Sequence, residues 1–476
     1  MSLANPPYLS SLQNNIRARP IPWDGAVRAG NLSEEQLKII KSVDKVRKEQ
    51  RKQTIELNTD PYATLLAGGE SGPSVLEKAQ KRQDIIQYIL VLATDLIADV
   101  PVLATSILQR TDPYKQYLAL LGSSNNPEDA VPLLAATFLA NLVAFSLTSS
   151  SKAVERDSDA LPKLYSYLST LVKSQDAGLQ DIGVQHMSTV LRSSSAKETF
   201  WKQKNDTIAP LFDILRKAAG AAKDTDSTLW SGAASVRSAD TRFGGGVGLQ
   251  LMYHILLVIW QLSFEAELVG PGLEEDEEIV PLYVQLLRMS PKEKTTRLLL
   301  ATLHNLLEAN KKTLIPIATT ARLPALLANL ATRHLTDDDA KEDLDALDQM
   351  LDEYTKGQTT FDEYADEVQS GHLRWSPPHR SATFWRENAR KILQDKELPK
   401  KLAEITGKKW ESDKKVLAIA CNDIGNLVRE VPEHRTTLEK LGLKVRVMEL
   451  MTDADESVRW ESLKAVGEWM RYSFER

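Results

Sequence analysis

The sequence predicts an all-α protein built as an α-solenoid, and three observations carry that prediction. The 476 residues are 42% hydrophobic with only 6% aromatic residues, a Leu- and Ala-rich composition typical of packed helices. A stretch near the C-terminus repeats without gaps at an offset of 42 residues. The alternating Val, Ile and Thr between Asn-Gly turns that would indicate strands are missing from the sequence.

In the N-terminal part of the chain the sequence pattern predicts helices separated by short breaks. A basic helix is expected over residues 38–53, with Ser33 and Gln36 placed to form a capping box at its start. Gly and Ser in residues 68–74 separate this helix from the first apolar block. Its basic residues suit nucleic acid or a membrane, but because acidic residues interrupt them, docking against another helix is an equal alternative.

The middle of the chain contains a stretch without charged side chains, residues 243–264. Its length alone could span a bilayer, but Gln250, His254 and Gln261 fall on one helical face. We therefore expect a buried helix with a narrow polar stripe. The preceding residues 225–246 are a small-residue insertion too polar to pack, and weaker copies of the apolar helical spacing occur at residues 128–143, 176–191 and 294–308.

The C-terminal repeat consists of one amphipathic helix in two copies, residues 413–428 and 455–470. An acidic residue opens each copy, and Gly425 and Gly467 occupy equivalent positions, where a missing side chain permits close approach of a neighbouring helix. Gly442 is placed to end a short helix between the copies. Two or three helices in about 42 residues is the armadillo or HEAT type of unit.

Charge divides the chain more sharply than its net value of −6 suggests. Residues 337–367 hold 13 acidic and two basic side chains, about −11, so the rest of the chain carries about +5. The acidic helix within this block ends in Lys-Gly-Gln-Thr-Thr. We place a large N-terminal solenoid domain at residues 1–352, a short connector at 353–360 and a smaller C-terminal armadillo/HEAT-like domain at 361–476.

No pattern of catalytic, cofactor-binding or metal-ligating residues emerges. The seven histidines show no metal-binding spacing, and those inside apolar helices are expected to be hydrogen-bonded core residues. Cys421, the single cysteine, is interpreted as a small buried hydrophobe, so the chain has no intramolecular disulfide and is expected to be cytosolic. The mildly acidic balance disfavours nucleic acid as a partner, which leaves an extended surface for proteins.

Three segments carry a resemblance to a known family: residues 16–37, residues 359–392 and the C-terminal repeat pair through residue 451. They are most specific in Phe-Asp-Glu-Tyr at 361–364 and Trp-Ser-Pro-Pro-His at 375–379. Over essentially the whole chain the sequence resembles the H subunit of the vacuolar-type proton-translocating ATPase (V-ATPase).

The resemblance implies a non-catalytic regulatory subunit of the peripheral ATP-hydrolysing sector. Such a protein is needed for coupled proton pumping, and it silences ATP hydrolysis when that sector is detached from the membrane sector. In family terms the N-terminal domain binds the peripheral stalk made of the E and G subunits. The C-terminal domain contacts the membrane-embedded a subunit in the assembled pump, or the rotor and B subunits in the detached sector. The expected location is the cytosolic face of vacuolar or endosomal membranes, without direct insertion.

Candidate partner contacts follow from exposed aromatic and basic side chains. The preferred inhibitory contact is the loop between repeats, expected to expose a Trp with two Lys: Gly407, Lys408, Lys409, Trp410, Glu411, Ser412 and Asp413. Trp375, Phe384 and Trp385 are a second candidate, although a Pro-Pro turn flanked by aromatic residues favours pinning the connector onto the C-terminal solenoid. Arg17, Arg19 and Trp23 are the candidate stalk contact, with Trp23 as a local packing anchor the alternative.

Two other functions would suit a helical solenoid. An armadillo import adaptor would carry an array of Trp-x-x-x-Asn motifs, and only residues 201–205 fit that pattern, which disfavours it. A generic signalling scaffold remains the second alternative.

Overall fold

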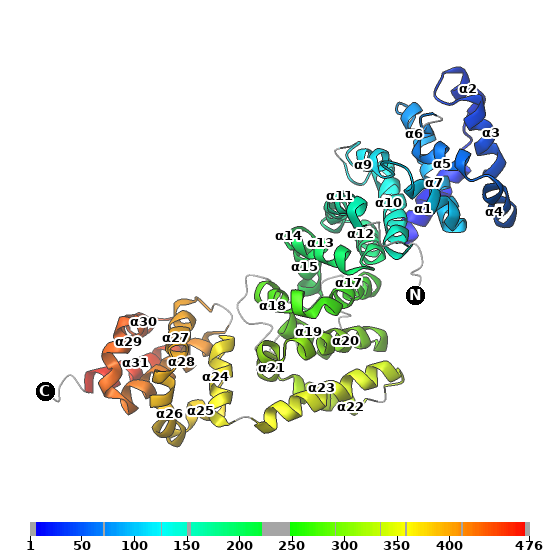
Figure 1. Cartoon of the computed structure of the whole chain (residues 1–476). Helices are drawn as coiled ribbons and strands as arrows, with labels where there is room; N and C mark the ends of the chain where they lie inside the picture. Colours follow the sequence, from blue (N-terminus) through cyan, green and yellow to red (C-terminus); the bar gives the residue numbers. More distant parts are fainter. Residues whose placement is uncertain are drawn as a thin grey trace. The chain divides into compact units, whose positions relative to one another are not determined.

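The computed structural model describes residues 6–69, 72–124, 126–149, 154–220, 248–290, 292–333, 335–357, 359–410 and 413–471. Across these residues the chain forms helices, and the single β feature is an isolated antiparallel bridge between Gly69 and Gly72. The all-α prediction is confirmed, and the helices follow one another in the manner of an armadillo-like solenoid (Figure 1). The insertion predicted at residues 225–246 and two members of the predicted contact loop, Glu411 and Ser412, lie outside the described residues.

The chain divides into two compact units, each described separately below. The first comprises Met1–Ile214 and Val247–Glu265, and the second comprises Leu215–Gly246 and Ala266–Arg476. The helices up to the end of the first unit are α1 (Pro7–Ala18), α2 (Trp23–Arg28), α3 (Glu34–Val43), α4 (Lys48–Leu57), α5 (Asp60–Ala67), α6 (Val75–Lys78), α7 (Gln83–Asp99), α8 (Pro101–Leu108), α9 (Lys115–Leu121), α10 (Ala130–Ser149), α11 (Val154–Val172), α12 (Ala177–Val190), α13 (Ser194–Lys202), α14 (Lys204–Thr207), α15 (Ala209–Ala218), α17 (Leu249–Leu262) and the 3₁₀ turn η2 (Ser263–Glu265).

The remaining helices belong to the second unit. They are α18 (Ala266–Glu277), α19 (Ile279–Met289), α20 (Glu293–Ala309), α21 (Lys311–Thr320), α22 (Leu323–Ala331), α23 (Asp338–Gly357), α24 (Thr360–Ser370), α25 (Pro377–Arg380), α26 (Ala382–Gln394), α27 (Glu397–Gly407), α28 (Lys414–Glu430), the 3₁₀ turn η3 (Pro432–His434), α29 (Arg435–Lys440), α30 (Leu443–Leu450) and α31 (Glu456–Arg471).

The core of the first unit is a succession of apolar helices in which α7, α10, α12 and α17 each pack on the next. The histidines on α12 and α17 are hydrogen-bonded inside the core, as predicted, whereas Gln250 of the predicted polar stripe is exposed. His186 Nε2 lies 3.0 Å from Thr137 Oγ1, and His254 Nδ1 lies 2.5 Å from Asp181 Oδ1. Gln261 of the predicted polar stripe donates to the Ser188 carbonyl at 3.1 Å. Burial lowers the pKa of His186 to about 4, so this side chain is neutral in the fold.

Two helical stretches of the described chain, Ala130–Thr148 and Leu249–Glu277, are long and apolar enough to cross a membrane. In their most apolar windows 78% and 50% of the residues, respectively, are buried inside the protein. The second stretch begins within the uncharged run identified from the sequence and continues beyond it through acidic residues, and its helix α17 packs against α12.

The basic helix predicted over residues 38–53 is wrong as a single element. The capping box is present, with the Ser33 side chain accepting from Gln36 N, but α3 ends at Val43 and α4 begins at Lys48. Between them Lys45 adopts a positive φ of 56°, which no helix tolerates. The uniform run of charged residues gave no signal of this break.

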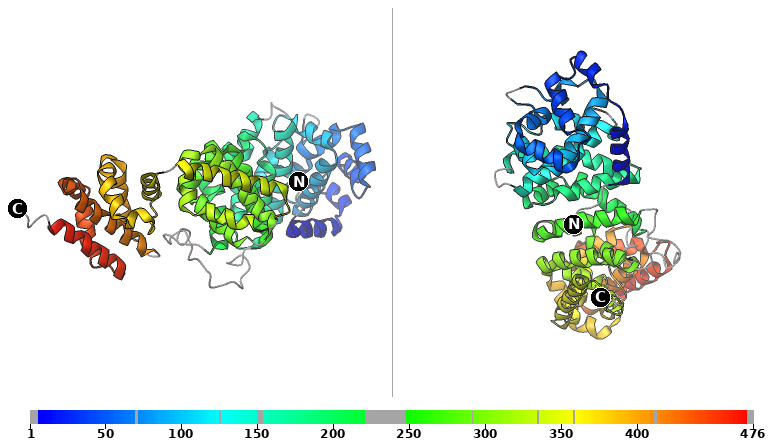
Figure 2. Two further views of the ribbon diagram at one scale, coloured as in Figure 1. Left: turned by 90° about the horizontal axis from the view of Figure 1, so that it is seen from below. Right: turned by 90° about the vertical axis from the view of Figure 1, so that its right-hand side faces the viewer.

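The C-terminal helices share one core, and its two copies of the repeated helix, α28 and α31, pack directly on each other (Figure 2). A Cβ at Gly425 would lie only 3.1 Å from Ala465 Cα, so the predicted close approach is confirmed there. Gly467, its equivalent, has open space around it, and the same prediction is wrong for that position. Gly442 separates α29 from α30 with φ +79°, which confirms its predicted role.

Candidate functional site: the connector segment and the C-terminal helices

We use the name connector segment for α24 and the extended residues 371–376 that follow it. This segment follows the connector predicted at residues 353–360. α24 begins with a capping box in which Thr359 and Asp362 form reciprocal hydrogen bonds. The preceding helix, α23, ends at Gly357, two positions before Thr359. Gly371 ends α24 in the left-handed conformation. Glu367, near the end of α24, accepts hydrogen bonds from the backbone N of Arg374 and, at 2.8 Å, from Ser376 Oγ. The carboxylate of Glu367 therefore folds the extended residues back onto their own helix.

A buried charged triad joins the connector segment to the C-terminal helices. His379 Nδ1 lies 2.8 Å from Asp423 Oδ2 on α28, and its Nε2 lies 3.3 Å from Glu367 Oε1. His379 and Asp423 are almost completely inaccessible, with exposures of 1% and 0%. Burial by itself would lower the pKa of His379, but the two carboxylates outweigh burial and raise the pKa to about 10. His379 is thus a charged bridge between the segment and α28.

Aromatic side chains surround this triad. The rings of Tyr364, Phe384 and Trp385 contact one another, with centroids 5.3 Å from Tyr364 to each of the others and 5.5 Å between Phe384 and Trp385. Trp385 Nε1 donates to the carbonyl of His379. Phe384 and Trp385 are 4% and 1% exposed, so both belong to the core, in agreement with the pinning interpretation. Trp375 is partly exposed, with the Arg380 guanidinium 5.3 Å from its ring centroid. Of the three aromatic candidates, Trp375 keeps a surface that a partner can reach.

The predicted contact loop presents its lysines but not its tryptophan. Gly407, Lys408 and Lys409 are exposed, whereas Trp410 is completely buried and donates from Nε1 to the Ile405 carbonyl at 2.7 Å. The expectation of an exposed Trp410 is therefore wrong. Its physical reason is a backbone φ of 43° at Trp410, which turns the indole inward against the ring of His372, 5.2 Å between centroids. The indole anchors the loop and leaves two adjacent ammonium groups in solvent.

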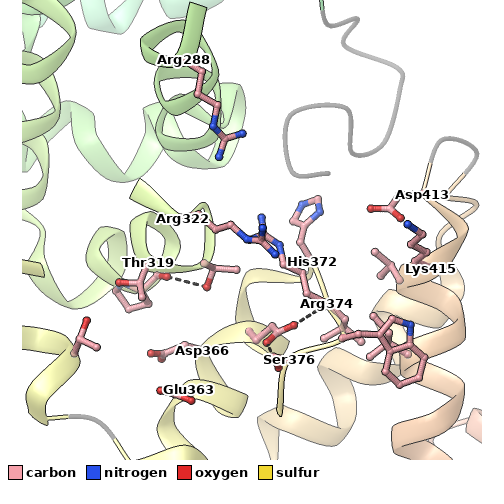
Figure 3. A pocket seen from close by; sticks show the side chains of 18 residues that line it. Arg288, Thr319, Arg322, Glu363, Asp366, His372, Arg374, Ser376, Asp413 and Lys415 are labelled. Carbon is pink, nitrogen blue, oxygen red and sulfur yellow. Dashed lines mark hydrogen bonds between the residues drawn. The ribbon is translucent and has the colours of Figure 1, made fainter. Parts of the chain in front are cut away.

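A cavity of about 760 Å³ opens beside the connector segment, within the second unit (Figure 3). Arg288 at the end of α19, Arg322 before α22 and Arg374 of the connector segment line one side of it. Burial and the charge of Arg322 lower the pKa of Arg288, and burial together with Arg322 lowers the pKa of Arg374 to about 10. Sequence reasoning missed this group, because its members are spaced by 34 and 52 residues and form no local motif.

The N-terminal candidates lie in the first unit. Arg17 is engaged in a bidentate pair with Asp95 on α7, with Nη2 2.8 Å from Oδ1. Trp23 packs edge-on against Tyr88 at 5.5 Å, which favours the local-anchor alternative, while Arg19 is exposed. The roles of these residues and of the loop lysines in partner binding stay predictions.

Two family models, both described as the H subunit of the V-ATPase, match the chain in succession, over residues 7–351 and 357–474. The chain belongs to the V-ATPase H subunit family. The resemblance inferred from the sequence is thereby confirmed. A V-type proton ATPase H subunit from Drosophila melanogaster is 28% identical over 469 residues, which cover 97% of this chain and 89% of the relative. A probable V-type proton ATPase H subunit from Caenorhabditis elegans is 26% identical, covering 95% and 89%.

Among solved structures, a designed armadillo repeat protein is similar to 64% of this chain and 99% of its own, with 14% identity and a TM-score of 0.27.

Proposed function

We propose that this protein is the non-catalytic regulatory subunit of the peripheral V-ATPase sector. It supports coupled ATP-driven proton pumping and inhibits ATP hydrolysis when that sector is detached from the membrane sector. The observation that carries the proposal is the family membership over nearly the whole chain, residues 7–351 and 357–474. In this role the protein attaches peripherally to the cytosolic face of vacuolar or endosomal membranes.

In this proposal the two predicted domains bind different partners. The N-terminal domain, residues 1–352, anchors the protein to the E and G stalk pair. The C-terminal domain, residues 361–476, contacts the a subunit in the assembled pump, or the rotor and B subunits in the detached sector. Residues 353–357 of the connector predicted at 353–360 lie in α23, so we propose that the junction between α23 and α24 allows two positions of the C-terminal domain. The populations of these positions follow the differential affinity of the domain for the two sets of partners.

The inhibitory contact we propose is the loop that carries Lys408 and Lys409. Both ammonium groups are exposed, and their loop is held in place by the buried indole of Trp410 and by a hydrogen bond from Lys414 Nζ to the Lys409 carbonyl, 3.2 Å. An ordered loop loses less conformational entropy on docking than a mobile one. Residues 370–476 carry about +4 (21 basic, 17 acidic), which suits an acidic partner surface and makes the contact salt-dependent.

The test is charge reversal in the full-length chain. The double variant Lys408→Glu/Lys409→Glu is added to the detached ATP-hydrolysing sector after removal of its own H subunit, and ATP hydrolysis is measured at low and at moderate salt. We expect wild type to inhibit and the variant to inhibit at least about tenfold less strongly, because two attractive contacts become repulsive. Binding to the isolated E and G pair is measured in parallel and should be unchanged.

The matched control is Lys311→Glu/Lys312→Glu, another adjacent and exposed lysine pair, on α21. This variant should inhibit as wild type does. Full inhibition by the Lys408/Lys409 variant would refute the contact loop, and failure of the wild-type chain to bind the E and G pair at either salt would refute the proposed function itself.

A further inference from the structure

The arginine side of the cavity beside the connector segment brings three like charges together. Figure 3 shows the guanidinium of Arg322 reaching toward Arg374, with Arg288 above them. Within the described chain neither Arg288 nor Arg322 has an ion pair, and the one hydrogen bond of the Arg288 side chain goes to the Ala321 carbonyl at 3.2 Å. Burial and, after it, the positive charge of Arg322 lower the pKa of both Arg288 and Arg374.

The carboxylates that line the same cavity do not neutralise Arg288 and Arg322. Glu367 is occupied by Ser376, by the backbone of Arg374 and by the charged His379. Asp366 accepts a hydrogen bond from the Tyr354 hydroxyl. In Figure 3, Glu363 and Asp366 lie on α24, apart from the two arginines, and Asp413 lies beside Lys415 on the opposite wall. Arg374 feels the charges of Glu367 and Asp413, whereas the positive charges of Arg288 and Arg322 remain without an ion pair in the described chain.

Arg322 occupies a left-handed backbone position, which glycine adopts readily and an arginine does not. Its φ is +64° and its amide donates to the Thr319 carbonyl at 2.9 Å, where α21 ends and α22 begins. The turn between α29 and α30 has the same construction. There the left-handed residue is Gly442, with φ +79°, and its backbone N–H donates a hydrogen bond of 2.9 Å to the Glu439 carbonyl. The chain thus places an arginine, with the strain of a left-handed Cβ, where its own equivalent turn uses glycine.

We propose that Arg288, Arg322 and Arg374 form a binding site for a soluble small molecule bearing two or more phosphoryl groups. Planar guanidinium groups bind phosphoryl oxygens through paired N–H donors, and an anion placed between them removes their mutual repulsion. The cavity volume of about 760 Å³ is that of a small-molecule pocket. Lys415, exposed on the opposite wall, supplies a further cation to a ligand that crosses the cavity.

The site has a structural consequence for the protein. Arg288 and Arg322 belong to α19 and the turn before α22, whereas Arg374 belongs to the connector segment. A bound polyphosphate links these elements and stabilises the arrangement in which α24 of the connector segment lies against α21. The site depends only on the cavity and its charges, and it stands independently of the contacts proposed for the pump.

The experiment is calorimetric titration of the full-length protein with inorganic tripolyphosphate at moderate salt, with citrate as a non-phosphoryl polyanion. We expect saturable tripolyphosphate binding that is stronger than citrate binding. The decisive variant is Arg322→Gly, which removes the guanidinium and also relieves the left-handed strain. It should bind tripolyphosphate roughly 10- to 100-fold more weakly while its thermal midpoint without ligand is equal to or above that of wild type.

Arg374→Gln should weaken binding similarly, and Arg390→Gln, an exposed arginine paired with Glu433, is the matched control that should bind as wild type does. Hydrogen exchange of residues 371–376 should slow on addition of tripolyphosphate in wild type but not in Arg322→Gly. Equal affinity in wild type and Arg322→Gly, or no binding to wild type, overturns the proposal. Binding to phosphatidylcholine vesicles containing a phosphoinositide, without binding of tripolyphosphate, would assign the cavity to a lipid headgroup and also overturn it.

Discussion

Replacing His379 by glutamine tests what holds the connector segment to the C-terminal helices. In wild type the ring bridges Asp423 at 2.8 Å and Glu367 at 3.3 Å, all three groups being buried or nearly so. The variant leaves two carboxylates facing each other without a cation. Removing one partner of a buried ion pair costs about 3–5 kcal/mol, because the remaining charge is uncompensated. We expect a loss of this size in the stability of the C-terminal helices.

The same bridge predicts a pH dependence with a definite sign. The folded pKa of His379, about 10, lies above the unfolded value of about 6.5. The proton is therefore held more tightly in the fold, and the stabilisation is fully present below about pH 6.5 and is lost as pH rises toward 10. Between about pH 6 and about pH 9 wild type should lose up to about 3 kcal/mol through this group, a loss that the variant lacks.

Hydrogen exchange measured peptide by peptide is the suitable assay, because it reports local opening of α26 and α28 whatever the first unit does. At about pH 6 the variant should exchange roughly 10²- to 10³-fold faster than wild type in these helices. His434→Gln, an exposed histidine of the same group of helices, is the control and should leave exchange unchanged. Equal protection in wild type and His379→Gln, after correction for intrinsic rates, would refute the bridge.

Two further predictions concern the C-terminal core. Gly425→Ala should lower stability by about 1–3 kcal/mol, because its Cβ meets the α31 backbone, whereas Gly467→Ala, in open space, should gain up to about 1 kcal/mol; thermal melts of the pair compare them, and equal effects would contradict the packing. Cys421 is buried with its thiol pKa raised to about 12 by burial, so it should resist a disulfide reagent near neutral pH until denaturant is added, and rapid labelling of the native protein would contradict its burial.

The fold was predictable because short-range sequence patterns determine most of its helices. Apolar spacing of three and four, capping residues and the gapless repeat at 413–428 and 455–470 each report on neighbours along the chain. Even there, a repeated glycine had two meanings: Gly425 faces α31, while a Cβ at Gly467 would meet open space. The break between α3 and α4 could not be predicted from the sequence, because the composition does not indicate that Lys45 adopts a left-handed conformation.

The site was predictable only in part, because burial and convergence are decided by the tertiary fold. The sequence around Trp410 predicts an exposed aromatic residue beside two lysines. In the structure the backbone of Trp410 is left-handed and its side chain is buried. His379 was recognised in a motif, but its partner Asp423 lies 44 residues away inside a helix that reads as apolar. The three arginines of the cavity lie on elements far apart in the sequence, which the tertiary fold brings together.

The brevity of the link before α24 limits where the partners of the C-terminal helices can be. A single residue separates Gly357, the last of α23, from Thr359, the cap of α24. A link of that length spans less than about 10 Å even when extended, so α24 must begin close to the end of α23. In the function proposed above, any two docking surfaces used in turn by the C-terminal helices must then both lie within reach of the end of α23, and their separation on the larger assembly is a measurable length.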